Sequence, residues 1–376
     1  VTVIGEEPWG NYNRIMLSPV LSGEKTIEDI MLHPHTWYSD KGIKFIADDP
    51  AIKIDRTRKT VHTEKGETVD YDRLIIATGS KPFIPPVQGV DLKGVISFRD
   101  IYDVNTMIKY CETKKNAVVI GGGLLGLEAA YGLKQRGMNV TVLHLMDRIM
   151  ERQLDGRASR MLRHSIEEKG IKIITEANTE ALIGKNGHVS QIRLKDGTLL
   201  DADLVVFAVG IRPNITLAQS AGLRCNRGIL VNDTMQTFDP SIYAVGECIE
   251  HRNQTFGLVE PLWGQAFICA SHLAEHGSLT FKSPTVPTQL KVSGVDVFSA
   301  GNFEPKEDYE DIILNDEKRH IYKRIIIQKD KVIGAVLFGD TEDGMWYAEL
   351  IADQTPVSTF RNKLLFGKDF ALKKAG

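Results

Sequence analysis

The feature that most constrains this chain is a strand, a glycine-rich turn and a helix that follow one another between Asn116 and Gly137. The segment reads AVVI, then GGGLLG at 121–126, then a helical stretch, and a second apolar run, VTVL, follows at 140–143. Glycines at this spacing permit a tight turn and the close approach of a pyrophosphate to the N-terminus of the helix. Because a strand and a helix flank the glycines, the pattern predicts a dinucleotide-binding βαβ unit rather than mere packing.

An earlier part of the sequence repeats this module without its opening. GIKII at 170–174 leads through two turns to a buried strand that ends at Pro213, and GIKFI at 42–46 leads in the same way to Pro82. The VTVI run at 1–4 matches the VTVL run of the other copy. Each copy is predicted to contain a three-stranded antiparallel excursion and a returning strand. The first copy lacks about two dozen residues, the size of a strand-turn-helix opening, so we expect a truncated chain.

The remaining sequence predicts a third domain. Two short strands within 228–247 and a helix at 264–276 return to the first module. From about residue 283 the apolar pattern alternates, which predicts strands, without a glycine fingerprint. These predicted strands are 290–292, 322–328 and 332–337, and a helix is predicted at 347–353. We therefore expect an α/β fold of two Rossmann-like domains and a small α+β C-terminal domain. The predicted boundaries are 1–98 with 228–282, then 99–227, then 283–376.

Composition excludes several classes of function. With 376 residues and a net charge of −3, the chain has no broad basic surface for nucleic acid. No apolar run approaches the roughly 18 residues of a membrane span, and no signal segment opens the sequence, so we expect a cytoplasmic protein. Neither a zinc or iron–sulfur motif nor a redox dithiol is present, and no metal is expected. The residues considered for these roles were Cys111, Cys225, Cys248, Cys269, His33, His35, His272 and His276.

Taken together, the motifs resemble the flavoprotein disulfide reductase superfamily with two dinucleotide folds. Within it they are most similar to the N-terminal flavin module of the assimilatory NAD(P)H nitrite reductase large subunit, with NADH:rubredoxin reductases close behind. The segments that carry the resemblance are NYNRIMLSPVLSGEKT at 11–26, IGGGLLGLEAA at 120–130, MERQLD at 150–155, VGIRPN at 209–214 and IYAVGECIEHR at 242–252. The resemblance implies a glutathione reductase-type fold in which the first copy binds FAD and the second binds NAD(P)H.

The resemblance also implies residues for the FAD site. An acid after the second strand takes the adenosine ribose hydroxyls, because a carboxylate can accept both hydrogen bonds. Arg14 lies on the loop that passes the isoalloxazine, with a plain surface arginine as the alternative. Trp263 is expected to open a helix whose N-terminus faces the flavin pyrimidine. The expected FAD-binding residues are Glu6 or Glu7, Asn13, Arg14, Ala77, Thr78, Gly79, Gly246, Glu247 and Trp263.

For the nicotinamide side, the resemblance places Glu128 near the junction of the two rings and makes it, with Arg14, a catalytic candidate. His144 stands where relatives have the acid that reads the adenosine ribose, and Arg148 and Arg152 lie nearby, where they could meet a 2′-phosphate. If 147–152 begins a helix, the two arginines share one face, which could point to solvent or to the domain interface instead. We expect both nucleotides to be used, with a modest lean to NADH. The expected nucleotide-binding residues are Gly121, Gly122, Gly123, Leu124, Leu125, Gly126, His144, Arg152 and Gly210.

The function implied is hydride transfer from NAD(P)H to FAD, followed by one-electron steps to an iron–sulfur and siroheme unit or a small redox protein. A stand-alone NADH:rubredoxin or ferredoxin reductase is the alternative, and an FAD/NAD sensor or degenerate scaffold is an alternative of another class. Ferredoxin-reducing relatives often carry a lysine in the segment occupied here by 17–19, and peroxide-reducing relatives carry a cysteine within 14–21. Neither residue is present. The terminal acceptor, a homodimer and FAD retention by the truncated chain stay open.

Overall fold

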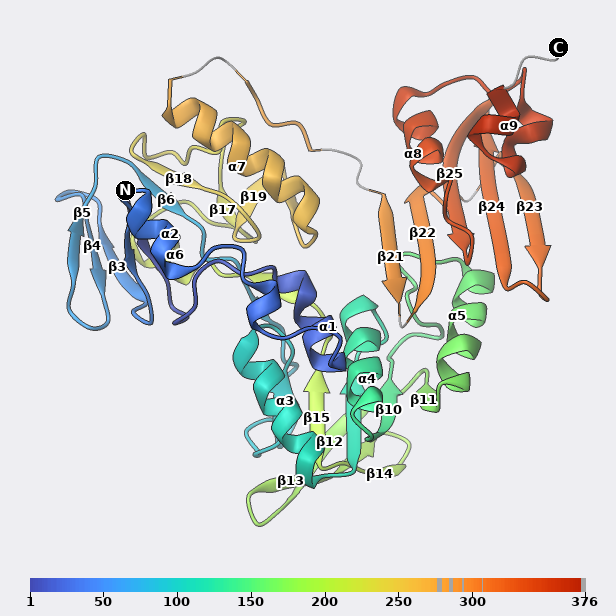
Figure 1. Ribbon diagram of the computed structural model, residues 1–376, viewed down its shortest axis with the longest axis horizontal. Helices are drawn as coiled ribbons and strands as arrows, with labels where there is room; N and C mark the ends of the chain where they lie inside the picture. Colours follow the sequence, from blue (N-terminus) through green and yellow to red (C-terminus); the bar gives the residue numbers. More distant parts are fainter. Residues whose placement is uncertain (276–278, 284–286, 293, 306, 373–376) are drawn as a thin grey trace.

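The computed structural model describes residues 1–275, 279–283, 287–292, 294–305 and 307–372. The second copy forms a parallel sheet in the order β11-β10-β9-β15-β8. Its strands are β8 (Val95–Ser97), β9 (Asn116–Ile120), β10 (Asn139–Leu143), β11 (Ile171–Ile174) and β15 (Leu204–Phe207). The helices α3 (Ile101–Thr113), α4 (Leu124–Gln135) and α5 (Gly156–Glu168) accompany this sheet (Figure 1). Because β8 pairs with β15, the predicted boundary at 98/99 is wrong, and the second domain includes β8.

Both predicted antiparallel excursions are confirmed. In the second copy β12 (Thr179–Lys185), β13 (His188–Leu194) and β14 (Leu199–Asp201) form one three-stranded sheet. In the first copy β3 (Ala51–Asp55), β4 (Thr60–Thr63) and β5 (Thr68–Asp70) form another. The two modules therefore share an architecture as well as a sequence pattern.

The first copy has two short parallel sheets where the second copy has one. β1 (Thr2–Ile4) pairs with β2 (Lys44–Ile46), and β6 (Leu74–Ile76) pairs with β18 (Ile242–Ala244). By the strand order of the second copy, β1 corresponds to β10 and β6 to β15. Among the described residues no strand occupies the place between β1 and β6 that β9 holds in the other sheet, and Val3 and Ile75 are exposed on these two strands.

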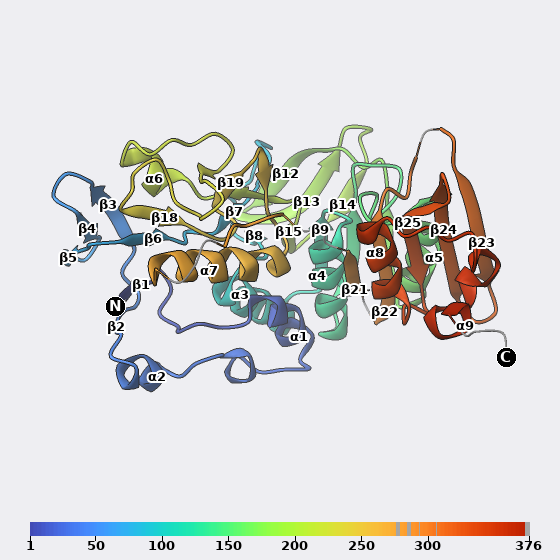
Figure 2. The ribbon, with the colours of Figure 1, turned by 90° about the horizontal axis from the view of Figure 1, so that it is seen from above.

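A short helical segment of the first copy packs on the second copy. After η1 (Arg14–Met16), α1 (Leu17–Ser22) lies against α4, as both views show (Figures 1 and 2). A Cβ on Gly132 would stand 2.7 Å from Leu21 Cγ, so this helix approach depends on glycine. Arg136 then donates to the carbonyl oxygens of Val20 and Leu21. The contact fixes the predicted flavin loop against the nucleotide-binding helix.

The rest of the first module consists of short elements and the longer helix α7. They are η2 (Glu28–Ile30), α2 (His35–Asp40), α6 (Thr216–Ser220), β17 (Ile229–Leu230), β19 (Ile249–His251), β20 (Gln254–Thr255) and α7 (Val259–Leu273). The helix α7 begins at Val259, one turn before the predicted start at 264. Proline in the first turn is compatible with a helix because the missing N–H has no partner there, and Pro261 lies in that turn. His276 lies outside the described residues.

The C-terminal domain is an antiparallel sheet in the order β21-β22-β25-β24-β23, covered by helices. Its elements are β21 (Thr288–Val292), β22 (Val295–Gly301), β23 (Glu310–Asp316), β24 (Ile321–Gln328), β25 (Lys331–Phe338), α8 (Gly344–Asp353), η3 (Arg361–Phe366) and α9 (Lys368–Leu372). The predicted α+β pattern is confirmed, although β22 and β23 had not been singled out. Figure 1 shows this sheet beside α5 of the second copy. None of the described helices combines the length and hydropathy that a membrane crossing requires.

Candidate nucleotide-binding site

The returning strands of the two copies meet at one seam. β7 (Ser80–Pro82), which follows β6, pairs antiparallel with β16 (Ile211–Pro213), which follows β15. Asn214 N–H donates to the carbonyl of Gly79 at 2.9 Å, and Phe83 N–H donates to the carbonyl of Gly210 at 2.9 Å. Dinucleotides bind at the carboxyl ends of parallel strands. Both candidate nucleotide sites therefore face this seam, and the two predicted glycines lie within it.

The glycines of the 121–126 turn serve different purposes. Gly121 has φ +127°, and a Cβ there would lie 2.2 Å from Ala208 O. A Cβ on Gly126 would lie 1.9 Å from Gly121 O. A Cβ on Gly123 would meet no described atom within 4 Å. Gly121 and Gly126 are thus required by the protein itself, and so is Gly122, whose Cβ would lie 2.8 Å from His144 Cγ. Gly123, the N-cap of α4, instead leaves open space where a pyrophosphate can approach the helix N-terminus.

His144 follows β10 directly, as expected, but its ring is not free to bind a ribose. Gly122 N–H donates to His144 Nδ1 at 3.0 Å, and His144 Nε2 lies 3.0 Å from Glu151 Oε2. The imidazole is buried between the turn and the loop that follows. The expectation that His144 donates to a ribose hydroxyl is therefore wrong for this structure, because both ring nitrogens have protein partners. Sequence analysis missed Glu151, although it stands within the MERQLD segment.

The two arginines near His144 do not form a phosphate clamp. Arg148 pairs with Glu304 of the C-terminal domain, while Arg152 has an 86% exposed side chain and approaches Glu151 only at 3.9 Å. No helix begins at 147–152, because α5 begins at Gly156. Arg148 thus connects two domains, and Arg152 is a solvent-exposed residue of a loop.

Glu128 of the second copy forms a hydrogen bond to the first copy. Ser18 of α1 donates its hydroxyl to Glu128 Oε2 on α4 at 2.6 Å. Burial raises the pKa of the Glu128 carboxyl, and the hydrogen bond from Ser18 opposes this rise. Glu128 is therefore not an ordinary surface glutamate. Its hydrogen bond to Ser18 links the predicted nicotinamide side to the segment 17–19, where ferredoxin-reducing relatives often carry a lysine.

The loop after β1 orders Glu7 and Arg14 together. Glu7 Oε1 pairs with Arg14 Nη2 at 2.6 Å, and Tyr12 donates its hydroxyl to Glu7 Oε2 at 2.6 Å. Arg14 Nη1 donates in turn to the carbonyl of Arg99 at 2.9 Å. Burial raises the pKa of Tyr12, so this hydroxyl stays a donor. With both Glu7 oxygens engaged, exposed Glu6 is the better candidate for the ribose acid.

Glu247 has two partners, of which the sequence predicted neither. Its Oε2 accepts from Ser80 Oγ at 2.8 Å and from Arg99 Nη2 at 2.5 Å. Next to it, Gly246 N–H donates to Gln265 Oε1 at 2.8 Å, while the fully buried Gln265 Nε2 has no partner among the described residues. A buried unpaired donor is costly. A polar cofactor atom at this point would satisfy it, so the residues fit FAD.

Sequence analysis did not predict that Arg99 and Gln265 lie at the candidate FAD site. Arg99 follows a strand that was assigned to the wrong domain, and Gln265 lies within a helix expected to begin at 264. Trp263 does not open that helix. It lies in the second turn of α7 with 67% exposure, near Phe267 at 62%, so the expectation of a helix N-terminus at Trp263 is wrong.

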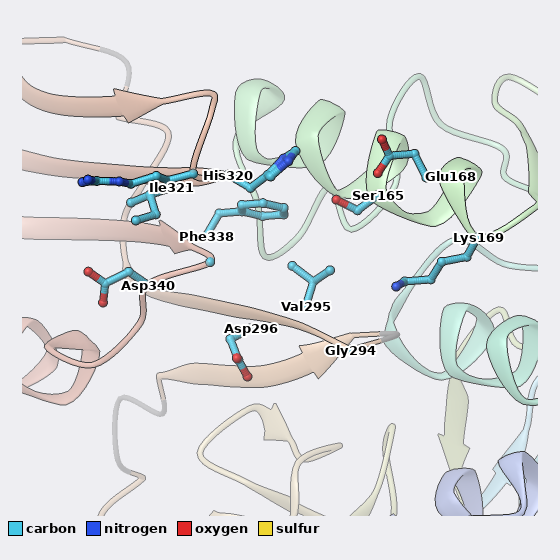
Figure 3. A pocket seen from close by; sticks show the side chains of 12 residues that line it. Ser165, Glu168, Lys169, Gly294, Val295, Asp296, His320, Ile321, Phe338 and Asp340 are labelled. Carbon is cyan, nitrogen blue, oxygen red and sulfur yellow. The ribbon is translucent and has the colours of Figure 1, made fainter.

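A pocket of about 580 Å³ lies elsewhere, between the C-terminal end of α5 and the third domain (Figure 3). Ser165 and Lys169 of the helix face Asp296 and Asp340 of the sheet across it. No residue predicted for a nucleotide site lines this pocket. It is therefore separate from the seam.

The fold, with β7 of the first module paired to β16 of the second, defines a class of protein. In this class, one chain contains two dinucleotide-binding modules whose binding sites face each other. This chain belongs to the pyridine nucleotide-disulphide oxidoreductase family, whose family profile matches residues 1–266. Residues 287–355 match the rubredoxin NAD+ reductase C-terminal domain. FAD and NAD(P)H are the cofactors that these matches support, and the chain is an oxidoreductase.

Two curated proteins and one solved structure are similar to most of this chain. The chain is 48% identical over 358 residues to "Nitrite reductase [NAD(P)H]" of Bacillus subtilis (strain 168), covering 95% of this chain and 44% of the relative. It is 42% identical to the "Assimilatory nitrate reductase electron transfer subunit" of the same organism, covering 97% of this chain and 47% of that protein. The crystal structure of NADH:rubredoxin oxidoreductase from Clostridium acetobutylicum superposes with a TM-score of 0.82 at 28% identity, covering 97% and 92% of the two chains. The chain thus spans about half the length of the curated relatives named here.

Proposed function

We propose that this chain is the NAD(P)H-oxidising flavin module of a nitrite reductase, with the first domain for FAD and the second for NAD(P)H. When bound, FAD supplies the chemistry that accepts a hydride and releases electrons singly. Glu128 and Arg14 are the residues proposed to act at the junction of the two cofactors. The third domain, 283–376, is proposed as an interface for a partner.

The observation that carries this proposal is the pairing of β7 with β16. It brings Gly79 and Gly210, the ends of the two returning strands, to opposite sides of one seam. Hydride transfer requires the two reacting rings within about 3.5 Å of each other. A seam that both sites face allows this contact, and the hydrogen bond between Ser18 and Glu128 is a second link between the two modules.

The protein's own groups would bind and orient the cofactors. Gly123 leaves the approach to the N-terminus of α4 open, and helix N-termini favour anions. Arg99 and Ser80 fix Glu247 in place, while Gln265 offers an unpaired donor beside it. These contacts support assignment of the seam to two nucleotides.

The acceptor is proposed from the relatives. The Bacillus subtilis proteins named above are a nitrite reductase and an electron transfer subunit of an assimilatory nitrate reductase. We propose an iron–sulfur and siroheme unit as the acceptor, reached from the flavin by one-electron steps. A second candidate, reduction of rubredoxin, is favoured by the match of 287–355 to the rubredoxin reductase C-terminal domain.

The test is anaerobic mixing of the flavin-loaded full-length protein with NADH or NADPH. Flavin bleaching within a few turnovers, followed by reoxidation when nitrite is added, supports the proposal. Reoxidation by rubredoxin and not by nitrite supports the second candidate. A stable charge-transfer complex without turnover would overturn both and indicate a nucleotide sensor.

A further inference from the structure

The loop after β10 places a carboxylate next to the residue at the position where dinucleotide folds read the adenosine ribose. In this fold the side chain just after the second strand, about 20 residues beyond the glycine turn, contacts the ribose 2′-hydroxyl. His144 occupies that position, and Glu151 Oε2 stands 3.0 Å from its Nε2. Because the Gly122 N–H donates to Nδ1, that nitrogen is the acceptor and Nε2 carries the hydrogen. Nε2–H therefore donates to Glu151.

We propose that Glu151 is the residue that makes the second domain prefer NADH over NADPH. This inference rests on the proposed function, because it assigns the nucleotide of that site. The carboxylate would accept a hydrogen bond from the 2′-hydroxyl of NADH and repel the 2′-phosphate of NADPH. Its Oε1 accepts no hydrogen bond within the described chain, and only Arg152 Nε approaches it, at 3.9 Å. One oxygen thus binds the histidine, and the other is available to a ligand.

The backbone holds this carboxylate beside the turn. Gly122 binds the loop twice, because its N–H donates to the His144 ring and its carbonyl accepts from Met150 N–H at 3.0 Å. Met150 is fully buried, and Ser159 Oγ donates to the carbonyl of Ile149 at 2.7 Å. Glu151 follows Met150 directly and keeps a 24% exposed side chain. The carboxylate is thus fixed in position and open to solvent.

The neighbouring arginines do not neutralise the negative charge of Glu151. Arg148 is paired with Glu304, and Arg152 extends into solvent with an 86% exposed side chain. Neither forms a hydrogen-bonded pair with Glu151 within 3.5 Å. A 2′-phosphate near Glu151 would therefore meet an anion whose ion-pair partner, Arg152, stands 3.9 Å away and extends into solvent.

The test is calorimetric binding of NAD+ and NADP+ to the flavin-loaded full-length protein and to Glu151→Gln. Glutamine keeps an acceptor for His144 Nε2–H but removes the charge. We expect the ratio of the NADP+ Kd to the NAD+ Kd to fall by about tenfold or more in the variant. Glu167→Gln, which removes a remote carboxylate paired with Arg163 on α5, is the matched control and should leave the ratio unchanged.

A second measurement needs no variant. Raising the salt concentration to about 0.5 M shortens the Debye length to roughly 4 Å and should reduce the wild-type preference for NAD+, while Glu151→Gln should respond less. An unchanged ratio in Glu151→Gln, or a wild-type preference insensitive to salt, overturns the proposal even though NAD+ binds. Failure of both nucleotides to bind would instead contradict the proposed function.

Discussion

Tyr322 of the third domain donates its hydroxyl to Asp155 Oδ2 at 2.7 Å, while Asp155 Oδ1 accepts from Ala158 N–H and so caps α5. One buried carboxylate thus begins a helix of the nucleotide domain and anchors the C-terminal sheet. Arg324 Nη1 adds a third contact to Oδ2 at 3.3 Å. Burial and the hydrogen bond to Asp155 raise the pKa of Tyr322, which keeps the hydroxyl a donor.

The first prediction concerns this anchor. Asp155→Asn can still cap α5, since asparagine is a good N-cap, but it removes the carboxylate that accepts from Tyr322. Arg324 loses one acceptor and keeps Asp311 and the carbonyl of Phe303. We expect a loss of about 2–3 kcal/mol in the free energy of unfolding, and about 1 kcal/mol for Tyr322→Phe. Urea denaturation followed by circular dichroism checks both values. Two variants as stable as wild type would contradict the anchor.

The second prediction concerns the contact between the two modules. Because burial raises the pKa of Glu128, the folded state binds its proton more tightly than the unfolded state. Stability should therefore fall as the pH rises from the ordinary pKa of a glutamate through the raised value. Glu128→Gln should remove this component of the pH dependence. Ser18→Ala deletes a hydrogen bond that lowers the pKa, so its loss of stability should extend to higher pH.

Thermal unfolding measured across the pH range tests this sign. Glu112→Gln, on an exposed side chain of α3, serves as the control and should follow the wild-type curve. Parallel curves for wild type, Glu128→Gln and Ser18→Ala would show that the carboxyl is not perturbed by the contact.

The third prediction concerns the open glycine of the turn. Gly123→Val should fold, because its Cβ meets no described atom within 4 Å and the backbone φ is −84°. The side chain would fill the space that the pyrophosphate needs, so NAD(P)H binding should be lost while the FAD module stays intact. Gly126→Ala is the contrast, since its Cβ would collide with Gly121 O, and we expect it to unfold or lose stability. Unchanged NAD(P)H affinity in folded Gly123→Val would refute the assignment.

The fourth prediction concerns FAD retention by the polypeptide 1–376. Among the described residues, its first module contains no glycine-rich turn and no strand between β1 and β6. Backbone N–H groups of such a turn and the following helix N-terminus hold a pyrophosphate. We expect weak or substoichiometric FAD, measured as flavin absorbance per mole of purified protein. A yellow preparation with stoichiometric FAD would disprove this.

Local periodicity and glycine spacing predicted much of the fold. The βαβ unit, both antiparallel excursions and the α+β third domain follow from apolar runs and turns only a few residues apart. The helix α7 begins at Val259 and not at 264, because a proline in the first turn, here Pro261, costs no hydrogen bond. The boundary at 98/99 was missed because the membership of β8 depends on its pairing with β15, more than 100 residues away.

The sequence by itself determined the two nucleotide modules and the glycines of the turn, because these depend on the conformations and sizes of neighbouring residues. Tertiary structure alone decided which side chains meet. From the sequence, His144 was expected to donate to a ribose, and Arg152 to meet a phosphate or point to solvent. In the fold His144 binds Gly122 and Glu151, and Arg152 lies in solvent. Hydrogen-bond partners distant along the chain are set by packing of separate elements, which no local pattern encodes.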